Sequence, residues 1–368
     1  MGETPLQDRL LEQALGRDNL LDLHRGQFLV LRADRLMQLG EGGQALALLE
    51  KAIPLFEAQG NLHQLAVTRG KIADVLHAQG ELAEPRRIWE EEELPVYEAL
   101  GDRRSVAVTR GKIADLLERQ GELVEARRIR EEVLPVLEAL GDRRSVAVTR
   151  GKIADLLERQ GELVEARRIR EEEELPVYEA LGDRQSIAIT RGQIADILQA
   201  QGDLAEARRI REEEELPVYQ ALGDRRSIAV AQGRIADLLA AEGDLDGAFA
   251  MHLERLGAAL EMNDIAVIAN VRFSCARVRI QRGDHEKGNL QTIYEELAEA
   301  FAITRQLRRL DAIGAIGGVL GWVLAMRGHP EEAVKVLEEA AAAFEKIEQP
   351  SMAAQCRQLI GQIKGGGS

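Results

Sequence analysis

The chain has 368 residues, of which 48 are Lys or Arg and 63 are Asp or Glu, so its formal net charge at pH 7 is −15. This balance repels phosphate backbones, and we expect no nucleic-acid partner. Two cysteines are too few for a disulfide framework, which favours a reducing cytoplasm. No charged-then-apolar signal segment opens the sequence, and we expect no membrane partner.

An internal repeat organises the sequence. Residues 101–132 read GDRRSVAVTRGKIADLLERQGELVEARRIREE and recur letter for letter at 141–172, while looser copies begin at Gly60, Gly182 and Gly223. A fixed period of this kind is typical of stacked units that bury their apolar faces on their neighbours. We therefore predict a repeat array rather than separate globular domains. The near-identity of the inner copies also admits an engineered or consensus origin.

In chain order, we expect an N-terminal cap helix at 1–19, a repeat array at 20–349, a capping helix at 350–364 and an added Gly-Gly-Gly-Ser linker at 365–368. The predicted repeats are 20–59, 60–100, 101–140, 141–181, 182–222, 223–262, 263–310 and 311–349. The uncharged run Ala312–Met326 is shorter than the roughly 20 residues that a bilayer span needs. We interpret it as a buried helix.

Each inner repeat is predicted to be a helical hairpin. In the copy that starts at Gly101, helix A covers about Arg103–Gln120, where apolar residues recur at three, four and seven, a helical period. Gly101 fits a helix end that needs positive φ, and Asp102 or Ser105 can cap the next helix. Helix B covers about Leu123–Leu140, and so short a connection makes the two helices antiparallel neighbours.

Helix B contains an interior proline, and some repeats hold one extra residue just before it. The repeats that begin at Gly60, Gly141 and Gly182 have 41 residues, whereas the repeat at 101–140 has 40. One extra helical residue is most easily absorbed as a π-bulge, and a proline, which lacks an N–H, is a natural neighbour for one. We predict a local bulge in the long repeats.

With Gly121 at the turn between the helices, the repeat resembles the tetratricopeptide repeat family. The signature positions hold small or apolar residues, namely Ile113, Ala114, Leu117, Leu123 and Ala126, and in the last repeat Leu320, Gly321, Gly328, Ala333 and Ala340. The resemblance covers about 20–349, and the long repeat is similar to kinesin light chains and MalT-type regulators. It implies an all-α, right-handed α-solenoid of about eight hairpins with a C-terminal capping helix. It also implies that a partner is held in a concave groove lined by helices A.

An acidic column is the most regular polar feature of the predicted helices A. Its members are Asp74, Asp115, Asp155, Asp196 and Asp237. In the resembling family this position faces the groove, where carboxylates would attract a basic or amide-rich segment. Lysines stand three residues earlier at Lys71, Lys112 and Lys152, a spacing that allows pairing on one helix face. Internal pairing and partner contact both stay open.

Further columns complete the candidate partner-binding residues. Arginines at Arg69, Arg110, Arg150 and Arg191 are each followed by a glycine, whose cost inside a helix favours close packing against another helix or a ligand. The family's clamp for C-terminal carboxylates has lysine and asparagine where this chain has these glycines and aspartates, so the clamp is not expected. More variable groove positions are His77, Glu118, Arg119, Glu158, Arg159 and Gln199.

The glutamate runs 90–93, 171–174 and 212–215 could form either a divalent-metal site or a solvated charged face. We expect the solvated face, because consecutive helical carboxylates point in different directions and cannot converge on one ion. The six histidines show no metal-ligand spacing, and no nucleophile elbow or phosphate-binding loop is present. Trp89 and Trp322 are expected in the core. We predict no catalytic residue, no metal and no cofactor.

The predicted function is therefore a non-enzymatic, cytoplasmic scaffold of a bacterial cell that binds a protein or peptide segment, which the acidic column would favour as basic. Two alternatives stay open. One is a small-ligand sensor of a bacterial signalling or defence system, with its pocket near 263–330. The other is a structural solenoid that self-associates head to tail.

Overall fold

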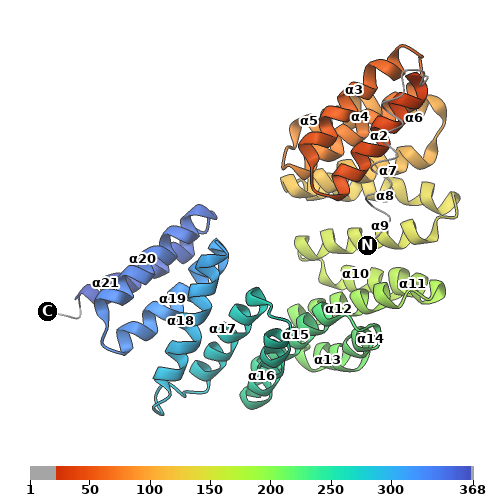
Figure 1. The fold of residues 1–368 in the computed structure, drawn as a ribbon. Coiled ribbons are helices and arrows are strands. Elements are labelled where there is room, and N and C mark those ends of the chain that lie inside the picture. The colour runs from red at the N-terminus through yellow and green to blue at the C-terminus, as the bar shows by residue number, and fades with distance from the viewer. Residues whose placement is uncertain (1–21, 366–368) are drawn as a thin grey trace. The chain divides into compact units, whose positions relative to one another are not determined.

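The computed structural model describes residues 22–365, and over that range the chain forms only helices and the turns between them (Figure 1). The predicted cap helix at 1–19 and the last three residues of the linker lie outside the described residues. The chain divides into two compact bodies, with the boundary between Gly182 and Asp183. The predicted all-α hairpin array is confirmed in both bodies.

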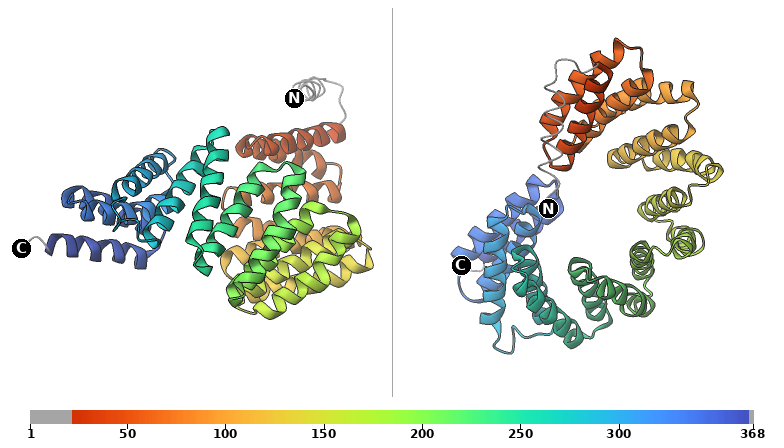
Figure 2. Two further views of the ribbon diagram at one scale, coloured as in Figure 1. Left: turned by 90° about the horizontal axis from the view of Figure 1, so that it is seen from below. Right: turned by 45° about the vertical axis from the view of Figure 1, so that its right-hand side comes forward.

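The N-terminal body consists of successive antiparallel hairpins (Figure 2). Its helices are α2 (Asp22–Gln38), α3 (Gly42–Glu57), α4 (Leu62–Ala78), α5 (Ala83–Arg87), η1 (Ile88–Glu93), α6 (Leu94–Leu100), α7 (Arg103–Gln120), α8 (Leu123–Ala139), α9 (Arg143–Gln160), α10 (Leu163–Arg168), η2 (Ile169–Glu174) and α11 (Leu175–Leu181). Here α2, α4, α7 and α9 are helices A. The segments α5–η1–α6 and α10–η2–α11 each form one helix B.

The C-terminal body continues the same pattern and ends in a single helix. Its helices are α12 (Arg184–Gln201), α13 (Leu204–Ile210), η3 (Arg211–Glu215), α14 (Leu216–Leu222), α15 (Arg225–Glu242), α16 (Leu245–Glu261), α17 (Ile265–Gln281), α18 (Leu290–Gln306), α19 (Leu310–Met326), α20 (Pro330–Lys346) and α21 (Pro350–Gly365). The capping helix α21 includes Gly365, which we had counted with the linker. Residues 282–289 extend the turn before α18.

The uncharged run of the last repeat is a buried helix, as predicted. Ile313, Ile316, Leu320 and Val323 of α19 are all buried, and the small Gly317 lets Phe301 pack closely against the helix. None of the helices in residues 22–365 combines the length and apolar character that a bilayer span requires.

The caps that the sequence predicts set the hairpin boundaries. Gly101 ends helix B with a φ of 68°, in the left-handed region that glycine adopts without steric cost. Asp102 then accepts a hydrogen bond of 3.0 Å from the backbone N–H of Ser105, which satisfies one free donor of the next helix. The helical period buries Ile113 and Leu117 of α7 between these caps.

The predicted π-bulges are confirmed. The three 41-residue repeats contain the π-helical segments η1, η2 and η3, whereas α8 of the 40-residue repeat runs without interruption. In each long repeat the leucine before the proline donates its N–H to the carbonyl five residues back, for example Leu175 to Arg170. The extra residue is therefore absorbed inside helix B, and the hairpins that follow keep their apolar register.

Candidate functional site

Each bulge turns the last glutamate of its run into the interior. Glu93, Glu174 and Glu215 are only 4–6% exposed. The carboxylate fits because the facing helix A carries a glycine: a Cβ atom on Gly151 would lie 2.5 Å from Glu174 Oε1. Gly70 and Gly192 face the other two glutamates in the same way. The predicted close packing is confirmed at these three glycines and was wrong at Gly111, where nothing lies within 4 Å of a Cβ atom.

The expectation that the glutamate runs form a wholly solvated face was therefore wrong at their last residue. A signal for this was present in the sequence. Val133 of the short repeat stands two residues before the proline, as Glu174 does in the next repeat, and Val133 is buried. Counting back from the proline would have placed the glutamate on the apolar face.

A buried arginine holds the glutamate in two of the long repeats. Arg170 is 1% exposed and bonds Glu174 at 3.0 Å, Asp155 at 2.5 Å and Glu158 at 2.9 Å. Burial acts to lower the pKa of Arg170, but the three carboxylates outweigh it and the pKa is raised. Arg211 makes the equivalent contacts with Glu215 at 2.7 Å and Asp196 at 2.6 Å.

Four members of the acidic column are paired internally, either by a buried arginine of their own repeat or by a lysine of the next repeat, and Asp237 lines a cavity. In the N-terminal body Lys71 bonds Asp34 at 2.6 Å, Lys112 bonds Asp74 at 2.8 Å, and Lys152 lies 3.6 Å from Asp115. Each lysine thus reaches the aspartate of the preceding repeat rather than the one three residues ahead on its own helix. These pairs tie neighbouring helices A together.

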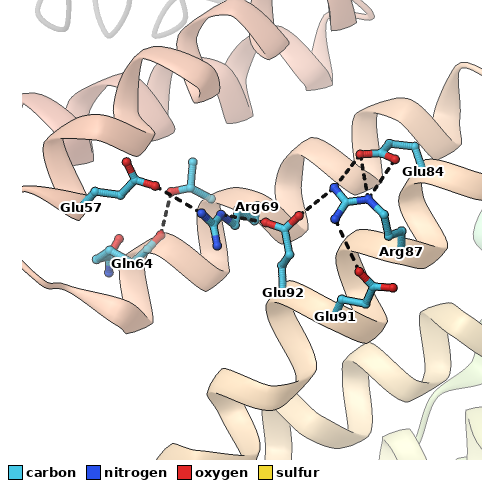
Figure 3. Close-up of polar contacts among 8 residues, drawn as sticks. Glu57, Gln64, Arg69, Glu84, Arg87, Glu91 and Glu92 are labelled. Carbon is cyan, nitrogen blue, oxygen red and sulfur yellow. Dashed lines mark hydrogen bonds and ion pairs between the residues drawn. The ribbon is translucent and has the colours of Figure 1, made fainter.

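The arginine column is also engaged by glutamates. Figure 3 shows Arg69 between Glu57 of the preceding helix B and Glu92 of its own repeat, at 3.2 and 3.0 Å. Later repeats follow the same scheme, with Arg110 on Glu98 and Glu132, Arg150 on Glu138 and Glu173, and Arg191 on Glu214. A binding role for this column would require a partner to compete with these bonds.

The variable groove positions form a second set of links between repeats. Arg119 Nη1 lies 2.9 Å from His77 Nε2, and Arg159 bonds Glu118 at 3.0 Å. Glu158 is held by the buried Arg170, whereas Gln199 lines a cavity with Asp237. The structure thus brings neighbouring members of the predicted set together as ladders along helices A.

Comparison with known proteins fits this architecture. The sequence model of the tetratricopeptide repeat matches residues 26–51, 191–213 and 316–344. The chain carries tetratricopeptide repeats. No curated protein sequence matched the chain.

Solved structures with tetratricopeptide folds are similar to the chain at low identity. A signal transduction ATPase with numerous domains from Pyrococcus horikoshii, which has a tetratricopeptide repeat sensor, shares 15% identity over 80% of this chain and 44% of its own, with a TM-score of 0.65. RapI in its apo form shares 13% over 77% and 99% of the two chains, with a TM-score of 0.57. Aspartyl phosphate phosphatase F from Bacillus subtilis shares 12% over 98% and 88%, with a TM-score of 0.56. The chain spans less than half of the ATPase, and these identities show a common fold alone.

The tetratricopeptide hairpins leave several cavities beside helices A. In the N-terminal body, one of about 290 Å³ lies between α4 and α7 and is lined by Asp74, Glu93 and Lys112, among others. In the C-terminal body, one of about 380 Å³ is lined by residues of α12, α15, α16 and α17, and another of about 260 Å³ by residues of α17 and α19 and the end of α18. Among residues 22–365 no three His, Cys, Asp or Glu side chains are grouped so that they could hold a metal ion.

Proposed function

We propose that the chain is a cytoplasmic, non-enzymatic scaffold that binds an extended or helical segment of another protein along the helix A face of its tetratricopeptide repeats. The observation that carries this proposal is the alignment of helices A within a body. Lys112 spans α7 to Asp74 of α4, and Arg159 spans α9 to Glu118 of α7, so equivalent positions face the same way in successive repeats. An extended chain can then meet similar groups at each repeat.

The aspartates of the column can bind such a segment although they are paired. The side chains of Asp115, Asp155 and Asp196 remain 46%, 35% and 42% exposed, because the arginine that each contacts lies buried beneath it. An ionised carboxylate accepts several hydrogen bonds, so oxygens stay open to donors on a partner. Lysine, arginine and amide side chains supply such donors, which favours a basic or amide-rich segment.

The test is selection from a random peptide library on the full-length protein, followed by affinity measurements on purified peptides. We expect basic peptides whose affinity falls at least tenfold in the double variant Asp115→Asn/Asp155→Asn. The matched control is Glu125→Gln/Glu165→Gln, which changes the same number of charges on helices B of the same two repeats. Equal losses in the two variants, or losses only in the control, would refute the groove assignment.

A small-ligand sensor is the second candidate function, and one observation favours it. The cavity of about 260 Å³ between α17 and α19 is lined by both apolar and polar groups, including Phe273, Asn270 and Arg309, a mixture typical of small-molecule sites. It lies in the region where the repeats diverge. A melting-temperature screen against metabolites tests this function: a shift that Asn270→Leu removes supports the sensor, and no shift from any compound opposes it.

A further inference from the structure

The second repeat lacks the buried arginine that each of the next three repeats contains. Trp89 occupies the position of Arg170 and Arg211, and it is 1% exposed. His77 stands where the later repeats have Glu118 or Glu158, and its ring packs edge-on against Trp89 with centroids 5.5 Å apart. Where the fourth repeat has the charged pair Arg170 and Glu158, the second repeat has an aromatic pair, Trp89 and His77.

The bulge glutamate of this repeat was not exchanged. Glu93 is 4% exposed, and its Oε2 atom has no hydrogen-bond partner in the described part of the chain. The hydroxyls of Thr109 and Tyr97, which line the same cavity as Glu93, act to lower the pKa of Glu93, but neither is a cation. Lys112, whose ammonium group acts to lower the pKa of Glu93, is bonded to Asp74 at 2.8 Å. A buried carboxyl oxygen without a partner is costly, and a bound group that donates a hydrogen bond to it would remove that cost.

Glu93 opens into the cavity of about 290 Å³ between α4 and α7. The three cations that line this cavity are already bonded to aspartates, Lys71 to Asp34, Lys112 to Asp74, and Arg104 to Asp142 at 2.8 Å. The Glu93 carboxylate is therefore the charged group of this cavity that has no cation bonded to it. Val67 and Val108 supply apolar wall, against which the aliphatic stem of a long basic side chain can pack.

We propose that this cavity is a subsite for one basic side chain of the bound segment, whose guanidinium or ammonium group takes the charge-neutralising part that Arg170 plays for Glu174. The subsite rests on the proposed scaffold function and adds one position of chemical specificity to it. The second repeat would thus receive its cation from a partner, whereas in the later long repeats the chain's own arginine bonds the buried glutamate.

The experiment uses two small probes on the full-length protein, N-acetyl-arginine amide and its neutral isostere N-acetyl-citrulline amide. Binding is followed by the fluorescence of Trp89 in a Trp322→Phe background, which leaves one tryptophan in the chain. We expect the arginine probe to bind at least tenfold more tightly than the citrulline probe. Glu93→Gln should remove this preference, whereas Glu91→Gln, on a side chain that is 68% exposed, should leave it unchanged.

The decisive variant for the missing arginine is Trp89→Arg/His77→Glu, which recreates the arrangement of the fourth repeat and is followed by calorimetry because it removes the fluorophore. We expect this variant not to bind the arginine probe, because its own arginine neutralises Glu93. For the same reason it should melt at a higher temperature than the parent. Equal affinity for both probes, or an arginine preference that survives Glu93→Gln, would overturn the subsite. Spermidine binding more tightly than the arginine probe would also overturn it, in favour of a free polyamine.

The outcomes separate the subsite from the scaffold. Selected peptides that lose affinity in Asp115→Asn/Asp155→Asn but not in Glu93→Gln would refute the subsite and leave the scaffold standing. A charge-selective response to the arginine probe, together with no peptide selected by the full-length protein, would support the cavity as a cation site and refute the scaffold.

Discussion

Replacing either of two glycines in identical helices by alanine should change the free energy of unfolding in opposite directions. Helices α7 and α9 have the same sequence, and Gly111 and Gly151 hold the same place in them. Nothing lies within 4 Å of a Cβ atom on Gly111, whereas one on Gly151 would lie 2.5 Å from Glu174 Oε1. The difference comes from helix B, which carries a bulge in one repeat and none in the other.

The magnitudes follow from two opposing terms. Alanine in place of a helical glycine stabilises by about 1 kcal/mol, so Gly111→Ala should raise the free energy of unfolding by up to that amount. At Gly151 the same gain meets an overpacking cost of about 1–3 kcal/mol. Glu174 cannot swing aside cheaply, because Arg170 holds it at 3.0 Å inside the body. We expect a net loss of up to about 2 kcal/mol.

Urea denaturation of the two single variants and the parent, followed by far-ultraviolet circular dichroism, measures both changes under one condition. Hydrogen exchange of α7 and α9 assigns each change to its repeat, since arrays need not unfold in one step. Shifts of the same sign and size in both variants would refute the link between bulge, glutamate and glycine.

Other predictions follow from the charges that the fold buries. Arg170→Met should cost about 3–5 kcal/mol, because it leaves three carboxylates without their buried cation, whereas Arg168→Met on the exposed face should leave the melting temperature within error. Equal shifts would contradict the buried network. Burial raises the pKa of Glu93, with Lys112 opposing, so between pH 4.5 and the raised pKa the native state holds a proton that the unfolded state has lost. Stability therefore falls as pH rises from 4.5 through the raised pKa, and Glu93→Gln should be more stable than the parent by about 1–3 kcal/mol at pH 7. The stability difference between Glu93→Gln and the parent should shrink on acidification. If Glu93→Gln is less stable than the parent at pH 7, the buried carboxylate is not the cost that we infer.

The helices and the bulges were predictable because both depend on local counting. Apolar residues at helical spacing, Gly101 before Asp102, and a short connection define the hairpin within one repeat. The long repeats have 41 residues and the short one has 40, so helix B must absorb one extra residue. The proline indicated where in helix B the extra residue lies. Neither step needed to know how neighbouring repeats pack against each other.

The pairing of the site residues was not predictable in the same way. Spacing on one helix shows that Lys112 can reach Asp115, but it does not show that Asp74 of the preceding helix lies closer. That choice depends on the offset between stacked helices, a tertiary quantity. The unpartnered oxygen of Glu93 was equally unpredictable. Trp89 is typical of a core residue, and its significance shows only when Arg170, at the same position, is found bonded to Glu174.

The bulges have a consequence for how such a chain can change over generations. Most insertions in a helix rotate everything downstream by about 100° and misdirect its side chains. Here the stretch before Leu-Pro can be one residue longer or shorter while the next helix A stays the same, as α7 after the bulged η1 and α9 after the uninterrupted α8 show. A residue gained or lost in this stretch is therefore tolerated, and a separate change of the residue two before the proline, valine at Val133 and glutamate at Glu174, decides whether the interior receives a charge.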